Sequence, residues 1–176
     1  VASMGALAIA PSDTMQVWAG SGEPNSRNSI EPGGGIYKST DGGITWTPMG
    51  LEKTEHIGHI AVHPTNPNVV YVAALGAAWR TNPERGLYKT EDGGRTWRLI
   101  KHVSDRAGFV NVQLDPTEAA RPRLTAWRRL GTWWARPTLY VAGVLLSTDR
   151  VDADCCVCAC MNGRHQSICD SSLDIP

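Results

Sequence analysis

Residues 37–50 read "YKSTDGGITWTPMG", and this stretch decides the fold because it nearly recurs. The second copy, "YKTEDGGRTWRLI", occupies residues 88–100. Asp41 and Asp92 hold the same place in the two copies and lie 51 residues apart. The question is why a chain of 176 residues carries the same polar turn twice, each time between apolar runs.

A second marker has nearly the same period. A short apolar run that ends in proline recurs at Pro11, Pro64 and Pro116, at spacings of 53 and 52 residues. Two independent markers with nearly one period indicate stacked supersecondary units, such as propeller blades or solenoid repeats.

The turn itself has the pattern Ser/Thr-x-Asp-x-Gly-x-Thr-Trp. An aspartate side chain accepts hydrogen bonds from backbone N–H groups that follow it, and glycine supplies the positive φ that tight turns need. The flanking β-type runs therefore predict a β-hairpin, from which the tryptophan carries apolar area back to the next layer. The positions concerned are Ser39, Asp41, Gly43, Thr45 and Trp46 in the first copy, and Thr90, Asp92, Gly94, Thr96 and Trp97 in the second.

This pattern resembles the Asp-box family, also called bacterial neuraminidase repeats. The wider context, "HPTNPNVVYVAA" at 63–74 and "GLYKTEDGGRTW" at 86–97, is similar to sortilin-type and glycosidase-type β-propellers. The resemblance covers about residues 5–117. It implies an all-β fold, a fragment of a β-propeller with two four-stranded Asp-box blades, the start of a third blade and an irregular C-terminal tail. It also implies that the boxes lie on the outer rim and act as structural turns.

Each repeat divides into four expected strands, at 6–11, 16–20, 34–39 and 44–49 in the first, and at 56–64, 69–75, 85–90 and 95–101 in the second. Four-stranded units of this length in series are typical of propeller blades. We therefore expect a first blade at 1–53, a second at 54–105 and the first strand of a third at 106–117. An open sandwich of stacked hairpins is the alternative.

The pattern breaks in residues 118–176. Three of the seven tryptophans fall in 127–134, and all five cysteines follow residue 154. One hypothesis is an out-of-frame reading of the gene near 118–125. The other is a genuine insertion followed by a divergent repeat.

Composition excludes some partners and leaves others open. With 17 basic and 17 acidic residues the formal net charge is zero, which argues against a nucleic-acid footprint. No apolar run of about 18 residues is present, so we expect no membrane span. The chain begins within repeat material, and we expect the remaining propeller blades of a larger protein as partners. An extracellular or periplasmic location is implied by the resemblance alone.

Candidate ligand-binding residues lie in the loops between the second and third strands of each repeat. Binding residues concentrate on long loops of a rigid scaffold. Residues 20–34 carry Glu23 and Arg27, and residues 76–84 carry Trp79 and Arg80. Trp79 could stack on a sugar ring, and the three charged residues could bind a polar ligand. The alternative is that these are solvated loops.

The connections between repeats add candidates on the same side, namely Glu55, His56, Asp105 and Arg106. We expect no cofactor and no metal. His56, His59 and His63 do not share one face of a strand, and the "CCVCAC" run at 155–160 lacks paired CxxC spacing.

Two functions of different class remain. The first is a binding scaffold for proteins, peptides or glycans, as in sortilin-type propellers. The alternative is part of a glycoside hydrolase, sialidase-like or xyloglucanase-like, whose catalytic residues lie mostly outside this chain. Glycoside hydrolysis needs two carboxyl groups about 5–10 Å apart, and Glu23 with Glu55 is a weak candidate pair. The first strands carry no arginine, which weakens the sialidase hypothesis.

Overall fold

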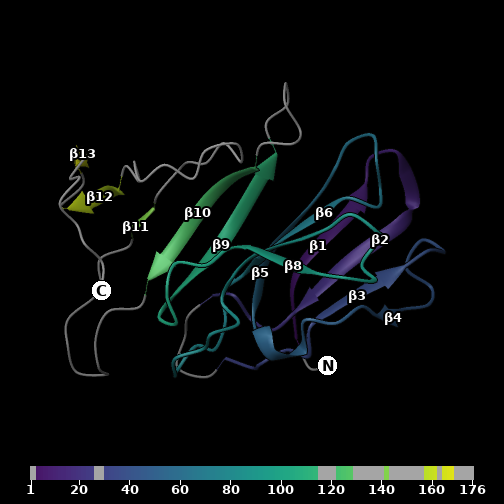
Figure 1. Cartoon of the computed structure of the whole chain (residues 1–176), viewed down its shortest axis with the longest axis horizontal. Helices are drawn as coiled ribbons and strands as arrows, with labels where there is room; N and C mark the ends of the chain where they lie inside the picture. The colour runs from purple at the N-terminus through teal and green to yellow at the C-terminus, as the bar shows by residue number, and fades with distance from the viewer. Residues whose placement is uncertain are drawn as a thin grey trace.

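Two four-stranded antiparallel sheets make up most of the structure, a computed structural model (Figure 1). It describes residues 3–25 and 30–114, and beyond these only the backbone of β10 (Pro122–Arg128), β11 (Val141–Ala142), β12 (Val157–Met161) and β13 (Arg164–Ile168). The first sheet contains β1 (Met4–Ala10), β2 (Asp13–Ser21), β3 (Ile36–Ser39) and β4 (Thr47–Pro48). The second contains β5 (Ile57–Val62), β6 (Val70–Ala74), β7 (Gly86–Thr90) and β8 (Arg98–Lys101).

In both sheets the order of the strands in space equals their order in the chain, as in a propeller blade. β5 lies against β1 of the first sheet on one side and against β9 (Ala107–Leu114) on the other. The first strands of successive units are therefore neighbours in space. The prediction of an all-β chain with two propeller blades and the start of a third is confirmed.

The second sheet is buried on both faces, which explains its sequence. All five residues of β6 are buried, and they form a continuous apolar run rather than an alternating one. One face packs on the first sheet, where Trp18, Ile36 and Ile57 belong to one core cluster. The other face packs on β9, where Tyr71 and Phe109 belong to a second cluster.

Two tryptophans join the first sheet to the second. The ring of Trp97 packs edge-on against that of Trp18, with 6.1 Å between centroids and 84° between planes. The indole N–H of Trp97 also donates to the Met49 carbonyl at 2.7 Å. A tryptophan ring of this kind contributes several kcal/mol, at about 25 cal/mol per Å² over roughly 200 Å² of buried surface.

Glycines allow the first strands to approach closely. A Cβ placed on Gly58 would lie 2.6 Å from the Val110 carbonyl oxygen, and one on Gly5 would lie 2.3 Å from that of Ile57. Neither distance is compatible with a side chain at these positions. Backbone thus meets backbone at both junctions.

The fourth strands begin later than the sequence predicts, at Thr47 and Arg98 rather than at 44 and 95. The cause is the polar turn, whose aspartates accept hydrogen bonds from the backbone N–H groups of Thr45 and Thr96. These N–H groups are therefore not available to the sheet, and pairing starts only after the turn.

β10 pairs antiparallel with β9, in the position of a second strand. The blade boundaries at 53/54 and 105/106 and the two hypotheses for residues 118–176 remain predictions, and most of that tail lies outside the described residues. Within the described part of the chain, no helix is long and apolar enough to cross a membrane.

Candidate functional site

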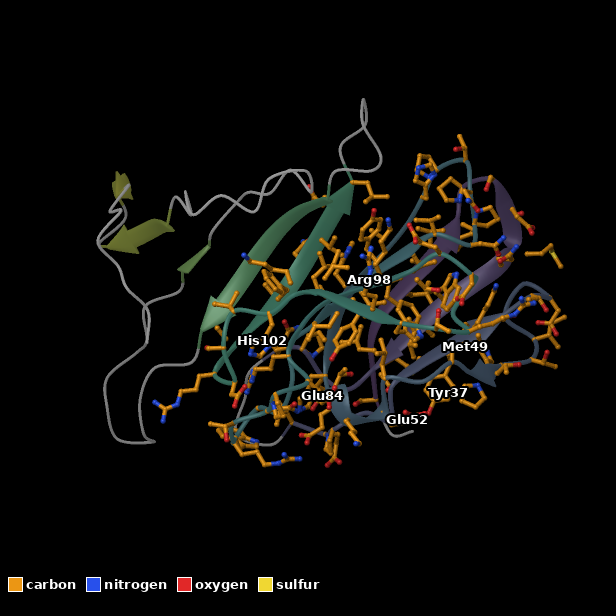
Figure 2. The ribbon with its side chains drawn as sticks, in the orientation of Figure 1. Tyr37, Met49, Glu52, Glu84, Arg98 and His102 are labelled. Atoms are coloured by element: carbon orange, nitrogen blue, oxygen red, sulfur yellow. The ribbon has the colours of Figure 1, made fainter. Side chains whose placement is uncertain are left out.

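Loops from three parts of the chain meet at one end of the second sheet. The loop between β6 and β7 lies beside the connection that contains the 3-10 turn η1 (Glu52–Thr54), since the Asn82 side chain donates to the Lys53 carbonyl at 3.0 Å. The Asn82 backbone N–H donates to the Asp105 carbonyl at 2.9 Å, which ties in the connection to β9. In Figure 2, Glu52 and Glu84 lie along the same lower edge of the molecule.

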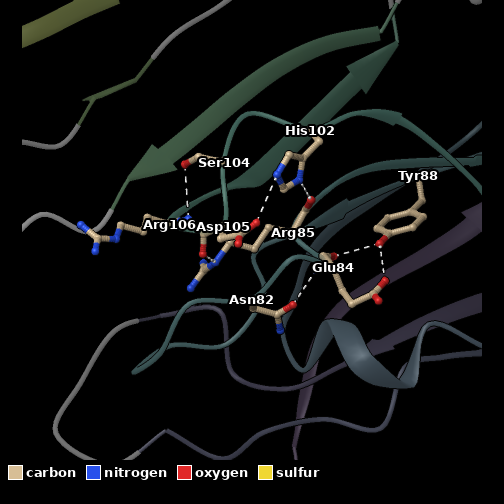
Figure 3. Close-up of polar contacts among 8 residues, drawn as sticks. All are labelled: Asn82, Glu84, Arg85, Tyr88, His102, Ser104, Asp105 and Arg106. Atoms are coloured by element: carbon tan, nitrogen blue, oxygen red, sulfur yellow. Dashed lines mark hydrogen bonds and ion pairs between the residues drawn. The ribbon is translucent and has the colours of Figure 1, made fainter. Parts of the chain in front are cut away.

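Arg85 holds this loop in shape from within. Its buried guanidinium donates to the backbone carbonyls of Leu75 and Ala77, to that of Arg80 at 3.1 Å, and to that of Asp105 at 2.9 Å. Figure 3 shows Arg85 beside Asp105 and other residues of the connection to β9. An arginine stays charged and offers five donors in a rigid plane, so one side chain can fix several turns of backbone. No motif marks Arg85 in the sequence, and sequence reasoning treated it only as the start of a strand.

Trp79 and Arg80 lie in this loop. The Trp79 side chain is 51% exposed, unusual for so large an apolar ring. The Arg80 guanidinium forms an ion pair with the Glu55 carboxylate of the preceding connection. Exposed ion pairs contribute little to stability, so the consequence of this pair is that Arg80 has a defined direction beside Trp79.

Glu55 has an unusual backbone. Its φ of 56° and ψ of −52° lie in a region that non-glycine residues rarely adopt. Its carbonyl accepts a hydrogen bond from the Gly33 N–H at 2.6 Å, which anchors it to the corresponding loop of the first sheet. Strained residues of this kind cluster at functional sites, and for that reason the Glu55–Arg80 pair is of interest.

Of the other predicted loop residues, Glu23 lies near His56, since its charge and its backbone both act to raise the pKa of that histidine. Glu23 accepts a hydrogen bond from the Glu31 N–H at 3.0 Å, so its carboxylate closes the loop of the first sheet. Arg27 lies outside the described residues. The carboxylates of Glu23 and Glu55 thus each have a partner of their own.

His56 is buried next to Glu55, and burial lowers its pKa against the opposing effect of the Glu55 carboxylate. On the far side of the loop, Nε2 of His102 lies 3.4 Å from the Asp105 carboxylate (Figure 3). The Arg106 backbone N–H donates to the Ser104 hydroxyl at 3.3 Å. Asp105 and Arg106 therefore belong to the same end of the sheet as Trp79.

The residues shared by the two repeated polar turns, the box residues, form a separate polar network within each turn. Asp41 accepts from the Ile44 N–H at 3.0 Å, and from the Thr45 N–H at 2.9 Å and hydroxyl at 2.5 Å. Asp92 accepts from the Thr96 N–H at 3.0 Å and hydroxyl at 2.6 Å. The pKa of Asp41 is lowered most by the hydrogen bond from the Ser39 side chain. The pKa of Asp92 is lowered most by the hydrogen bond from the Thr96 side chain. An aspartate that locks a turn must accept bonds of this kind. That Asp41 and Asp92 have this role remains a prediction.

In residues 3–25 and 30–114, no group of three or more His, Asp or Glu side chains is placed to hold a metal ion. The side chains of the cysteine run at 155–160 lie outside the described part of the chain.

Comparisons with known proteins show the fold, together with one relative that is similar over part of this chain. No protein-family profile matches the chain. A probable oligoxyloglucan-reducing end-specific xyloglucanase from Neosartorya fischeri is 30% identical over 92 residues, which is 52% of this chain and 11% of that protein. The structure of the GH74 xyloglucanase from Xanthomonas campestris matches with a TM-score of 0.50 and 16% identity, over 92% of this chain and 22% of the enzyme. An ancestral GH74 enzyme matches with a TM-score of 0.47 and 19% identity, over 72% of this chain and 19% of that enzyme.

The chain therefore spans about a tenth of its curated relative and about a fifth of each enzyme structure. At such low identity the Xanthomonas structure supports the fold alone. Together with the sheet order and the packing of β5 between β1 and β9, it identifies the chain as part of a β-propeller.

Proposed function

We propose that this chain supplies two blades of a propeller glycoside hydrolase that acts on a xyloglucan-like glycan, and that Trp79 and Arg80 contact the glycan. The observation that carries the proposal is the exposed Trp79 ring beside an Arg80 held by Glu55. The 30% identical stretch of a probable xyloglucanase supports the choice of substrate class. An extracellular or periplasmic location is part of the same proposal.

The chemistry of the loop suits a sugar chain. The face of a tryptophan ring offers a flat apolar surface to the C–H face of a pyranose, and Arg80 donates hydrogen bonds to hydroxyl oxygens. Arg85 supports both residues by fixing the carbonyls of the loop, including that of Arg80 itself. Glu23 and Arg27 remain weaker candidates for contacts from the neighbouring loop.

The catalytic carboxyl groups are expected mostly outside this chain. Both carboxylates of the weak candidate pair are engaged within the chain, Glu23 by the Glu31 N–H and Glu55 by the Arg80 guanidinium. The same observation favours a second candidate, a propeller that binds glycans, peptides or proteins without cleaving them.

The test uses the whole polypeptide that carries this chain, with Trp79→Ala and Trp79→Phe. Titration calorimetry measures the affinity for xyloglucan oligosaccharides, and a reducing-sugar assay measures hydrolysis. Removal of the ring should weaken binding at least about tenfold, in line with roughly 2 kcal/mol for an aromatic contact. Trp79→Phe should retain most of the affinity, since it keeps an aromatic face.

The outcomes separate the hypotheses. Unchanged affinity with a lowered melting temperature would assign Trp79 to packing and remove the proposed contact. Binding without release of reducing sugar would support the scaffold over the hydrolase. No binding of xyloglucan by the unsubstituted protein would overturn the proposed substrate class.

A further inference from the structure

His56 lies where the loop of the first sheet, the connection before β5 and the loop after β6 meet, and it is only 2% exposed. Its carbonyl accepts a hydrogen bond from the Leu75 N–H at 2.9 Å, just before the loop that carries Trp79 and Arg80. Its ring is hydrogen-bonded to the backbone of Glu23, in the loop of the first sheet. One buried histidine therefore links the loops of both sheets.

The repeat requires the backbone contact at this position but not the histidine. Ser3 lies 53 positions earlier, and its carbonyl accepts a hydrogen bond from the Gly22 N–H at 3.1 Å, as the carbonyl of His56 does from Leu75. Gly108 holds the equivalent place in β9. The three units thus carry serine, histidine and glycine here, so the architecture does not require an imidazole.

The backbone directly before this ring forms a strained turn. The His56 N–H donates to the Thr54 carbonyl at 2.6 Å, across Glu55. With φ of 56° and ψ of −52° at Glu55, this is a γ-turn of the rare, strained kind. The Glu55 carbonyl accepts from the Gly33 N–H, and its carboxylate pairs with Arg80. The direction of Arg80 therefore depends on a turn that its neighbours must hold in place.

The surroundings of the His56 ring suit its neutral form. Nδ1 is buried and has no hydrogen-bond partner among the described residues, so a proton added there would lack an acceptor. In the described part of the chain, the charged groups that act on the ring are the Glu55 and Glu23 carboxylates and the Arg85 guanidinium. Burial, the largest cause, and Arg85 lower the pKa of His56 against the opposing effect of the two glutamates. The folded protein therefore holds His56 as a neutral imidazole at pH 7.

We propose that His56 is a positioning residue for the glycan site, and that protonation of its ring releases Arg80 and weakens glycan binding. The effect on the glycan rests on the proposed function, whereas the release of Arg80 does not. Both carboxylates that act on the ring are already engaged, Glu55 by Arg80 and Glu23 by a backbone N–H of its own loop. A buried imidazolium must draw the Glu55 carboxylate away from Arg80 or open the strained turn to water. By either route Arg80 loses the contact that directs it.

The pH range of this release follows from the direction of the pKa shift. Because the pKa of His56 is lowered in the folded state, the junction keeps its full stability above the unfolded value of about 6.5. It loses this stability as the pH falls through 6.5 toward the folded value. Ordinary carboxylates have pKa values near 4, so mild acid titrates histidines before them.

Hydrogen exchange read by mass spectrometry tests the junction without any glycan, in the whole polypeptide that carries this chain. The segments to follow contain the N–H groups of Gly33, His56 and Leu75, and exchange is expressed relative to the denatured protein at the same pH. Between pH 7.5 and pH 5.5 the relative exchange should rise at least about tenfold in the parent protein, because local opening sets its rate. It should stay constant in His56→Gln, whose side chain does not titrate and keeps a donor for the Glu23 backbone.

Titration calorimetry with xyloglucan oligosaccharides then measures the effect on the site. The affinity of the parent protein should fall at least about fivefold between pH 7.5 and pH 5.5, and that of His56→Gln by less than about twofold. The matched control is His63→Asn, just beyond the other end of β5. Its side chain can accept from the Thr65 and Asn66 N–H groups, as the His63 ring does, so this variant should keep the pH dependence of the parent.

The outcomes distinguish the role of His56 from the proposed function. Relative exchange that does not change with pH in the parent protein would overturn the role of His56. An equal loss of affinity in the parent and in His56→Gln would overturn it as well. Exchange that depends on pH through His56, in a protein that binds no xyloglucan at either pH, would support the junction and overturn the proposed function instead.

Discussion

At the scale of single residues, each box aspartate gathers several hydrogen bonds of its turn on one carboxylate. Each accepts hydrogen bonds from the N–H and the hydroxyl of the threonine four positions later. Hydrogen bonds to the charged form lower the pKa of an aspartate, as they do here for Asp41 and Asp92. The turns therefore favour the ionised carboxylate in the folded state.

This coupling predicts a dependence of stability on acid. Because the folded pKa of both aspartates is lowered, their contribution is present above the unfolded pKa of about 3.9 and is lost as the pH falls below it toward the folded value. In the whole polypeptide, the double variant Asp41→Asn and Asp92→Asn should melt lower at pH 7 than the parent protein. Its melting temperature should also fall less between pH 4 and pH 2. Parallel melting curves over that range would contradict the assignment.

The sequence pattern marks the residues of the two turns but neither Arg85 nor the backbone conformation of Glu55, and the reason is physical. Asp41 and Thr45 interact within one turn, so a fixed spacing along the chain marks them. Arg85 binds carbonyls of the loop it closes and of the next connection, and Glu55, with its positive φ, accepts a hydrogen bond from Gly33 of a distant loop. These properties depend on how distant segments meet, which no short pattern records.

At the scale of strands, contact between the first strands of successive units depends on small residues. Gly58 lies where β5 and β9 approach backbone to backbone, and a Cβ there would lie 2.6 Å from the Val110 carbonyl oxygen. Gly58→Ala should therefore separate the strands and lower stability by about 1–3 kcal/mol, the usual cost of overpacking. Urea unfolding of the whole polypeptide measures this cost. An unchanged midpoint would mean that the junction is looser than the distance indicates.

The fourth strand of each sheet begins only after the polar turn and is therefore short. In the second sheet, Trp97 just before this strand contacts the first sheet through Trp18 and the Met49 carbonyl. Trp97→Phe keeps most of the ring and removes the hydrogen bond to the Met49 carbonyl. We expect a loss of about 1–2 kcal/mol, since the partly buried carbonyl loses its donor. Equilibrium unfolding of the whole polypeptide followed by far-ultraviolet circular dichroism measures the loss. Equal stability of the variant and the parent would show that the bond is replaced by water.

At the scale of the whole molecule, the period of the boxes and prolines is sufficient to predict the two four-stranded sheets and the order of the strands within each. The period does not predict which faces of the sheets are buried. Burial depends on which strands pack against each sheet, and the spacing of the repeats does not specify this. The second sheet is covered on both faces by the first sheet and β9. The first sheet has the same kind of residues on its outer face, and there Met4, Leu7 and Ile9 are exposed.

The chain of residues 1–176 by itself should therefore associate in solution. We expect it to bind a hydrophobic dye such as anilinonaphthalene sulfonate and to form larger species as its concentration rises into the micromolar range, because an unpaired blade leaves apolar surface in water. The double variant Leu7→Lys and Ile9→Lys should weaken both effects, since it places charge on the open face. The control Ile44→Lys, at the exposed turn tip, should weaken neither. Light scattering and dye fluorescence measure the outcome. A sharp, concentration-independent calorimetric transition of a monomer that binds no dye would show that two blades and a strand are stable without further neighbours.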